Sequence, residues 1–253
     1  MYTQPARQST INKINSVNQT DSWAFFDKVY CISIDDRRDR REQARKQFAE
    51  VGLLERVEFV IVKKHPENRE KGIVQSHMHC LKKGLKAGAR RILIFEDDVF
   101  FQGVDAPALH EACAFLHHRT KWNGFFLGGI TSGSSKTGLK CLVKIKYRCL
   151  SHAYALNRPL AERLVREPWS GIPFDGLLRR HNTDFYALYP MCAFQGLAGT
   201  DNQTVLIDRL RRLFGGLPFI QRANEFYQNH KAPLIIAHMA ILIMLGALAL
   251  KLW

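Results

Sequence analysis

The sequence is poor in the paired motifs that mark several common protein classes. Its six cysteines are scattered, and no two form a C-x-x-C pair, which argues against zinc binding and thioredoxin-type chemistry. The spacings of a zinc finger, a Walker loop and a dinucleotide-binding fingerprint are also missing. Because free cysteines in apolar segments behave as small hydrophobes, we expect thiols in a reducing compartment.

Acidic residues are also few relative to basic ones. The chain has 253 residues with 37 Lys and Arg against 23 Asp and Glu, which gives a formal net charge of +14. Such a charge favours anionic partners. Because no nucleic-acid-binding signature is present, we expect phosphorylated substrates and an anionic membrane surface rather than nucleic acid. The 46% hydrophobic content is that of a globular protein.

The two ends of the chain have opposite character. Residues 1–22 are polar, without the apolar core of a signal peptide, and are expected to form a flexible N-terminal arm. Residues 234–250 carry no charge apart from what His238 contributes when protonated. A helix over 232–253 is roughly 30 Å long, the thickness of a bilayer core, which predicts a transmembrane or membrane-anchoring helix. The alternative is a C-terminal helix packed on the domain.

The segment before this apolar run is basic. Residues 205–231 mix arginines with bulky apolar residues, which is typical of an amphipathic juxtamembrane segment or of an ordinary surface helix. By the positive-inside rule, a single-pass anchor of this kind places residues 23–204, the predicted catalytic domain, on the cytoplasmic side.

Strand and helix patterns alternate along residues 23–204. Strands are predicted at 28–34, 57–62, 91–96, 124–127, 142–145 and 152–156, and helices at about 38–51, 73–87, 106–118 and from Pro159. This alternation predicts an α/β fold with a mostly parallel sheet flanked by helices. The Gly/Ser-rich residues 128–138 are expected to form a mobile surface loop, with an active-site lid as the alternative.

Three adjacent acids follow the most apolar of these strands. Ile92 to Phe95 run directly into Glu96, Asp97 and Asp98. In open α/β sheets, ligands bind outside the carboxyl ends of strands. Three neighbouring carboxylates repel one another unless a cation lies among them, and Mg²⁺ or Mn²⁺ prefers such oxygen ligands. The motif therefore predicts a divalent metal site; a solvated acidic turn is the alternative.

Several motifs in this order resemble glycosyltransferase family 25, which includes lipopolysaccharide glycosyltransferases and collagen galactosyltransferases. The resemblance covers about residues 28 to 204. Its elements are an Asp/Arg-rich turn after the first strand, a Gly-x-x-x-Ser-His helix start, the Glu-Asp-Asp-Val motif, and the Pro-x-Asp and Pro…Gln elements. They stand here at 34–40, 72–77, 96–99, 173–175 and 190–195.

The resemblance implies a GT-A-type (Rossmann-like) fold, a nucleotide-sugar donor, a divalent metal and inversion at the anomeric carbon. It assigns Glu96 and Asp98 to the metal and Asp175 to deprotonation of the acceptor. The donor site would take Asp35, Arg37, Arg40, Ser76, His77, Asp97 and Gln195. The implied reaction moves a hexose, commonly galactose in this family, from a UDP-hexose to a glycan or glycolipid such as lipopolysaccharide.

Other interpretations of these residues stay open at this stage. Asp175 and Ser76 are suited to capping helices, and His77 to the core. His152 and His181 are further candidate metal ligands from the C-terminal half. For the whole chain, the competing functions are a metal-dependent phosphotransferase and a non-catalytic, membrane-tethered module that binds a nucleotide sugar or glycan.

Overall fold

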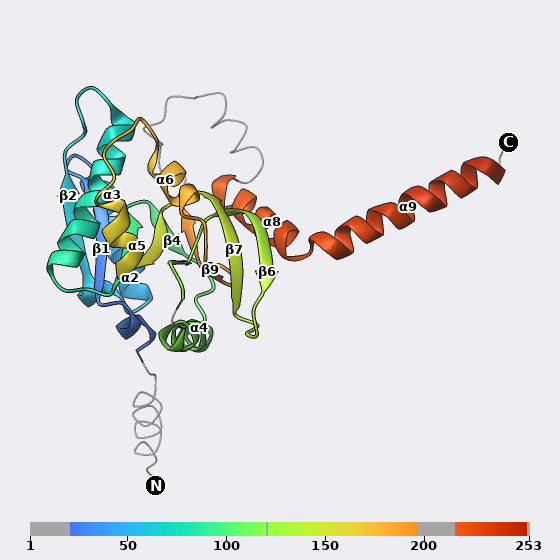
Figure 1. Ribbon diagram of the computed structural model, residues 1–253, viewed down its shortest axis with the longest axis horizontal. Helices are drawn as coiled ribbons and strands as arrows, with labels where there is room; N and C mark the ends of the chain where they lie inside the picture. The colour runs from blue at the N-terminus through green and yellow to red at the C-terminus, as the bar shows by residue number, and fades with distance from the viewer. Residues whose placement is uncertain (1–20, 120, 197–215, 252–253) are drawn as a thin grey trace, which may run out of the picture.

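The computed structural model describes residues 21–119, 121–196 and 216–251 (Figure 1). Of the predicted segments, the N-terminal arm therefore lies almost wholly outside the described residues, as do residues 205–215 of the basic segment. Asp21 and Ser22 at the edge of the predicted arm already belong to the domain, because the Ser22 hydroxyl donates to the carbonyl of Ala106 at 3.0 Å.

A mixed eight-stranded sheet, in the order β2-β1-β3-β8-β5-β9-β7-β6, forms the centre of the described fold. The strands are β1 (Lys28–Ile34), β2 (Val57–Val62), β3 (Arg91–Glu96), β5 (Gly124–Phe126), β6 (Ile130–Lys136), β7 (Leu142–Cys149), β8 (Ala153–Asn157) and β9 (Phe185–Leu188). The pairings set β8 and β7 against the direction of the others. The sheet is thus mostly parallel in strand direction, as predicted, with two reversed strands that the alternation did not predict.

Helices cover both faces of this sheet (Figure 1). They are α2 (Arg38–Glu50), α3 (Arg69–Lys86), α4 (Ala106–His118), α5 (Arg158–Leu164) and α6 (Phe174–Arg180), with short 3₁₀ turns η1 (Ser22–Phe25) and η2 (Leu54–Arg56). Helix α3 begins one turn earlier than predicted because Asn68 caps it, accepting from the amide of Lys71 at 2.8 Å.

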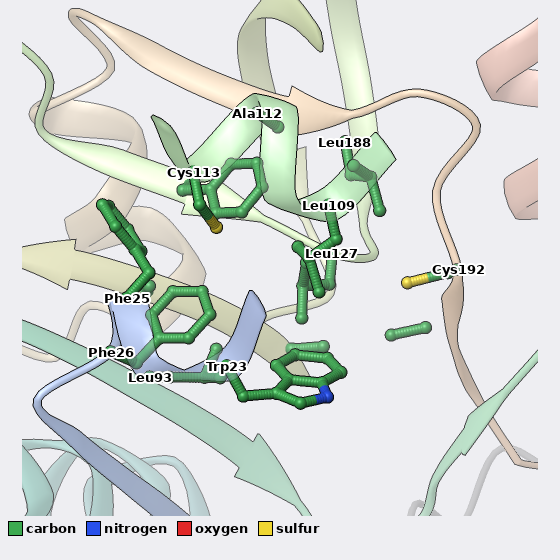
Figure 2. Packing of buried hydrophobic residues seen from close by; sticks show 14 of the residues in the cluster. Trp23, Phe25, Phe26, Leu93, Leu109, Ala112, Cys113, Leu127, Leu188 and Cys192 are labelled. Atoms are coloured by element: carbon green, nitrogen blue, oxygen red, sulfur yellow. The ribbon is translucent and has the colours of Figure 1, made fainter. Parts of the chain in front are cut away.

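Two apolar cores lie on the two faces of the sheet. Successive side chains of a strand point to opposite faces, so Leu93 and Phe95 of β3 enter one core while Ile92 and Ile94 enter the other. Figure 2 shows part of the first core, where Trp23, Phe25 and Phe26 of the N-terminal turn meet α4 and Leu93. Burial on both faces explains why β3 reads as one continuous apolar run.

The predicted mobile loop over 128–138 is wrong for most of its length. Residues 130–136 form strand β6 at the edge of the sheet, paired with β7 through a register that shifts twice. Small polar residues are poor strand formers, but an edge strand with one solvated side tolerates them, and the bulges absorb the irregular pairing.

The chain ends in two helices, α8 (Gly216–Asn229) and α9 (Lys231–Lys251). Helix α8 packs on β6 and on β10 (Ala193–Gln195), whereas α9 projects from the body of the protein (Figure 1). Across the described residues, the structure contains no helix whose length and apolar character suffice for a membrane crossing. The transmembrane prediction is therefore not supported, and the cytoplasmic orientation stays a prediction.

Candidate functional site

A cavity of about 630 Å³ lies at the carboxyl ends of β1, β2 and β3. Its wall brings together segments that are far apart in the sequence. They are the first turns of α2, α6 and α8, the N-terminal half of α3, the turn after β3, residues 150–152 before β8 and the end of β10. Among its lining residues are most of the predicted site residues: Arg40, Ser76, His77, Glu96, Asp97, Asp98, Asp175 and Gln195. The position follows the rule that ligands of α/β sheets bind beyond the carboxyl ends of strands.

Asp97 and Asp98 form a buried acid pair in the turn between β3 and β4 (Val99–Phe101). The Arg40 guanidinium lies 3.6 Å from Asp97 Oδ1 and 3.7 Å from Asp98 Oδ2. Gln195 donates to Asp98 Oδ2 at 3.1 Å. The opposite oxygens, Asp97 Oδ2 and Asp98 Oδ1, are buried without a hydrogen-bond partner. Such orphaned atoms are rare, and they mark a place where an interaction is missing.

Burial and mutual repulsion disfavour the charge on this pair. Burial, reinforced by the neighbouring charge of Glu96, raises the pKa of Asp98 to about 7. The pKa of Asp97 is also raised, chiefly by burial, although the Ser33 side chain and Arg40 act in the opposite direction. A second cation beside the pair would favour its ionised form.

Glu96 is held differently from its two neighbours. Burial alone raises its pKa, but the hydrogen bond and charge of His77 outweigh burial, so the pKa of Glu96 is lowered. His77 Nε2 lies 3.5 Å from Glu96 Oε1, and His77 Nδ1 lies 2.9 Å from the hydroxyl of Tyr154. The ring also stacks on Phe174 at 4.2 Å. His77 is thus both a satisfied core histidine and the partner of Glu96.

The acid pair fits a divalent cation of a particular kind. The described residues contain no ready-made cluster of three or more His, Cys, Asp or Glu side chains for a metal. Mg²⁺, however, is commonly held by one or two carboxylates while substrate phosphates and water complete its shell. The two unpartnered oxygens of Asp97 and Asp98 supply that minimum.

Asp175 stands in the first turn of α6 and is bonded through both of its oxygens. The Tyr147 hydroxyl donates to Oδ1, and the amide of Leu150 donates to Oδ2 at 3.1 Å. The alternative role as helix cap is wrong, because Pro173 occupies the N-cap position. Leu150, which also lines the cavity, has a φ of 73°, a left-handed conformation that is uncommon for leucine and concentrates at functional sites.

Of the two other candidate histidines, only His152 lines the cavity. Its Nε2 lies 3.2 Å from the carbonyl of Ala193, which can only accept, so this nitrogen carries the proton. Burial lowers the pKa of His152, which favours the neutral ring, and its Nδ1 has no hydrogen-bond partner. His181 instead pairs with Glu167 at 2.5 Å and does not line the cavity.

The remaining predicted residues divide between the cavity and its surroundings. Ser76 lines the cavity but bonds back to the carbonyl of Gly72 at 2.8 Å, so it is not a helix cap. Asp35 is exposed, Arg37 pairs with Asp39, and neither lines the cavity. Their contact with a donor stays a prediction.

Sequence reasoning missed Ser33, Tyr147 and Leu150. The Ser33 side chain acts to lower the pKa of Asp97, and Tyr147 and Leu150 hold Asp175. An alternating strand pattern contains no sign of which buried hydroxyl meets a carboxylate, and nothing in the residue type marks Leu150 for a positive φ.

Comparisons with known proteins find distant structural neighbours. No family model matches the chain. No curated protein matches it either. Among solved structures, A197 from STIV matches 66% of this chain and 83% of its own, with 13% identity and a TM-score of 0.44.

Two further neighbours are transferases by name. A mannose-1-phosphate geranyltransferase from Thermus thermophilus matches 64% of this chain and 73% of its own, with 13% identity and a TM-score of 0.41. A glycosyltransferase involved in the glycosylation of the major capsid of PBCV-1 matches 63% and 81%, with 9% identity and a TM-score of 0.38. The resemblance to glycosyltransferase family 25 is not confirmed by these comparisons and stays a prediction.

Proposed function

We propose that this protein is a metal-dependent, inverting glycosyltransferase that uses a nucleotide-sugar donor. The observation that carries the proposal is the acid pair Asp97 and Asp98, buried in a cavity with one unpartnered oxygen each. A nucleotide sugar brings a diphosphate, and a cation shared between that diphosphate and the two carboxylates would satisfy both.

In this proposal Asp97 and Asp98 hold the cation, and Glu96, paired with His77, lies beside them in the cavity wall. This revises the roles expected from the motif, in which Glu96 was a ligand and Asp97 a donor contact. When bound, the cation neutralises the negative charge that develops on the departing diphosphate. Arg40, which also lines the cavity, lies beside the other oxygen of each carboxylate and offsets part of their mutual repulsion.

Asp175 is the proposed general base. As the acceptor hydroxyl attacks the anomeric carbon, its proton passes to an Asp175 oxygen, a bond forms from the hydroxyl oxygen to that carbon, and the bond to the diphosphate oxygen breaks. The electron pair leaves with the nucleoside diphosphate. Each carboxylate oxygen has two lone pairs, so donation from Tyr147 and Leu150 leaves capacity to accept this proton.

The finer assignments rest on the resemblance to family 25. They are a UDP-hexose donor, galactose as the transferred sugar, and a surface glycan or glycolipid such as lipopolysaccharide as the acceptor. The net charge of +14 agrees with an anionic acceptor. Ser76 and Gln195, which line the cavity, are the proposed polar contacts for the donor.

The test is Mn²⁺-dependent hydrolysis and transfer by the full chain across a panel of nucleotide sugars. Asp98→Asn removes one carboxylate of the pair, and Asp36→Asn makes the same change at an exposed position that does not line the cavity. We expect turnover of one donor that requires Mn²⁺, disappears in Asp98→Asn and persists in Asp36→Asn. A folded wild-type protein that neither binds nor hydrolyses any donor would refute the proposal.

A further inference from the structure

Three segments of the chain converge on the carbonyl oxygen of Ala193. It accepts from His152 Nε2 at 3.2 Å and from Gln221 Nε2 at 2.9 Å. The backbone of Gly128 also approaches it so closely that an added Cβ would lie 2.0 Å from this oxygen. His152 and Gln221 are each only 1% exposed, so both hydrogen bonds are shielded from water.

Ala193 begins the strand that reaches the acid pair. Strand β10 pairs with β4 so that Gln195 stands opposite Val99, the residue after Asp98. The Gln195 side chain donates to Asp98 Oδ2, and the amide of Gly196 donates to the Asp98 carbonyl at 2.7 Å. A shift of β10 therefore moves both the side-chain and the main-chain contacts of Asp98.

Helix α8, whose first turn lines the cavity through Leu217, also packs against β10 and the residues before it. Besides the bond from Gln221, Glu225 Oε1 accepts from the amide of Met191 at 2.6 Å. The guanidinium of Arg222 lies 4.5 Å from the ring centre of Phe194. These contacts matter because β4 and β10 form a separate two-stranded sheet, which does not share the ladder of the large one.

We propose that Gln221 is a positioning residue for the cation and donor site, acting through the Ala193 carbonyl on β10 and on the ring of His152. The inference rests on the proposed function, because it assigns the role of Asp98 to cation binding. Gln221 touches no lining carboxylate itself. By filling the second acceptor direction of the carbonyl, it fixes the strand from which Gln195 reaches Asp98 and the group to which His152 donates.

The same helix supplies a matched control. Asn224, one turn further along α8, bonds the amide and carbonyl of Thr131 in β6 at 2.9 and 3.0 Å. It anchors the helix by side-chain amide contacts, as Gln221 does, but to a strand away from the acid pair. Gln221→Met and Asn224→Leu each replace an amide by an apolar group of similar size.

The experiment compares Mn²⁺ binding by calorimetry and amide hydrogen exchange over residues 193–196 in the two variants and the wild type. Loss of supporting contacts around a metal site typically weakens affinity 10- to 100-fold, so we expect about a tenfold weaker Mn²⁺ binding in Gln221→Met. Exchange at Gly196 should accelerate in the same variant. Asn224→Leu should lower the melting temperature while Mn²⁺ binding stays within about twofold of the wild type.

Equal effects of the two variants on Mn²⁺ binding and on exchange would overturn the proposal, because they would show that Gln221 only fastens the helix. Unchanged exchange at Gly196 in Gln221→Met would also overturn it. The exchange measurement needs neither metal nor substrate. A wild-type protein that binds no Mn²⁺ would therefore refute the proposed function, and the exchange data would still decide whether Gln221 holds β10.

Discussion

The acid pair and Asp175 line the same cavity, and the fold holds their carboxylates in opposite ways. Asp97 and Asp98 are buried beside Arg40, and each keeps one oxygen without a hydrogen bond. Asp175 is less buried, yet both of its oxygens are bonded, to Tyr147 and Leu150. Burial with unmet partners indicates where the charge of a ligand is missing, whereas full bonding indicates a side chain whose orientation is fixed in advance.

The largest effect should come from removing one member of the acid pair. Asp98→Asn takes away an anionic ligand, and a catalytic cation contributes several kcal/mol of charge stabilisation. We therefore expect turnover to fall on the order of 10⁴-fold. Steady-state kinetics and Mn²⁺ titration check this. Turnover close to that of Asp36→Asn would mean that the pair is not where the cation acts.

Asp175→Asn should separate the role of Asp175 in catalysis from that of the acid pair in cation binding. Removal of a general base typically costs 10²- to 10⁴-fold, so kcat should fall on the order of 10³-fold. Mn²⁺ binding should stay near that of the wild type, because Asp175 is not one of the proposed cation ligands. Asp184→Asn, at the Lys144 ion pair outside the cavity, is the matched control. Loss of Mn²⁺ binding in Asp175→Asn would show that Asp175 also takes part in cation binding and would contradict the comparison.

Tyr147→Phe tests whether full bonding of Asp175 matters for its orientation. The change removes one donor to the carboxylate and leaves the Leu150 amide in place. A hydrogen bond to a charged group contributes about 1.5–3 kcal/mol, so kcat should fall about 10- to 150-fold, with KM for the donor unchanged. A KM that rises while kcat holds would place Tyr147 in substrate binding instead.

The smallest effect concerns a carboxylate outside the cavity, Glu225 in α8. Burial raises its pKa to about 7 from an ordinary 4.5. Because the folded state holds this proton more tightly than the unfolded chain, the stability that Glu225 contributes is full below about pH 4.5. It is lost as the pH rises through about 7.

Glu225→Gln keeps the acceptor for the Met191 amide and removes the titration. Thermal unfolding of the variant and the wild type should coincide near pH 4.5. Near pH 8 the variant should melt at least about 3 °C higher, because the raised pKa of Glu225 corresponds to more than about 1 kcal/mol of unfolding free energy, and each kcal/mol shifts the melting temperature of a protein of this size by roughly 2–4 °C. If the wild-type protein instead became more stable than the variant as the pH rises, the pH dependence would have the opposite sign and this account would be refuted.

The sequence could predict that the acidic motif lies in the site, because its position follows from the topology of the sheet. An apolar run before Glu96 marks a buried strand, and the turn after such a strand lies at the ligand-binding edge of the sheet. The bonding within the cavity was not predictable, because it depends on contacts between distant segments. The contact between Glu96 and His77, for example, does not follow from the acidic motif, because His77 lies on another element, α3.

Edge strand β6 and helix α8 show that parts of the fold were also not predictable from the sequence pattern. Residues 132–136 lack strand-forming side chains, and their strand conformation comes from pairing with β7. In α8, the buried side of the helix carries the polar residues Gln221 and Glu225. A hydrophobic periodicity identifies a face that packs on apolar groups, so it cannot identify a face that docks by hydrogen bonds.

The close approach at Gly128 has a consequence for recognising relatives of this protein. A methyl group added at Gly128 would lie 2.0 Å from the Ala193 oxygen, which leaves no room for any side chain, and His152 Nε2 closes the other direction at 2.6 Å. A homologue that retains this junction must have glycine here. Any sequence with a larger residue at this place has a displaced β10, so one column of an alignment would separate chains that share the site from chains that share only the sheet.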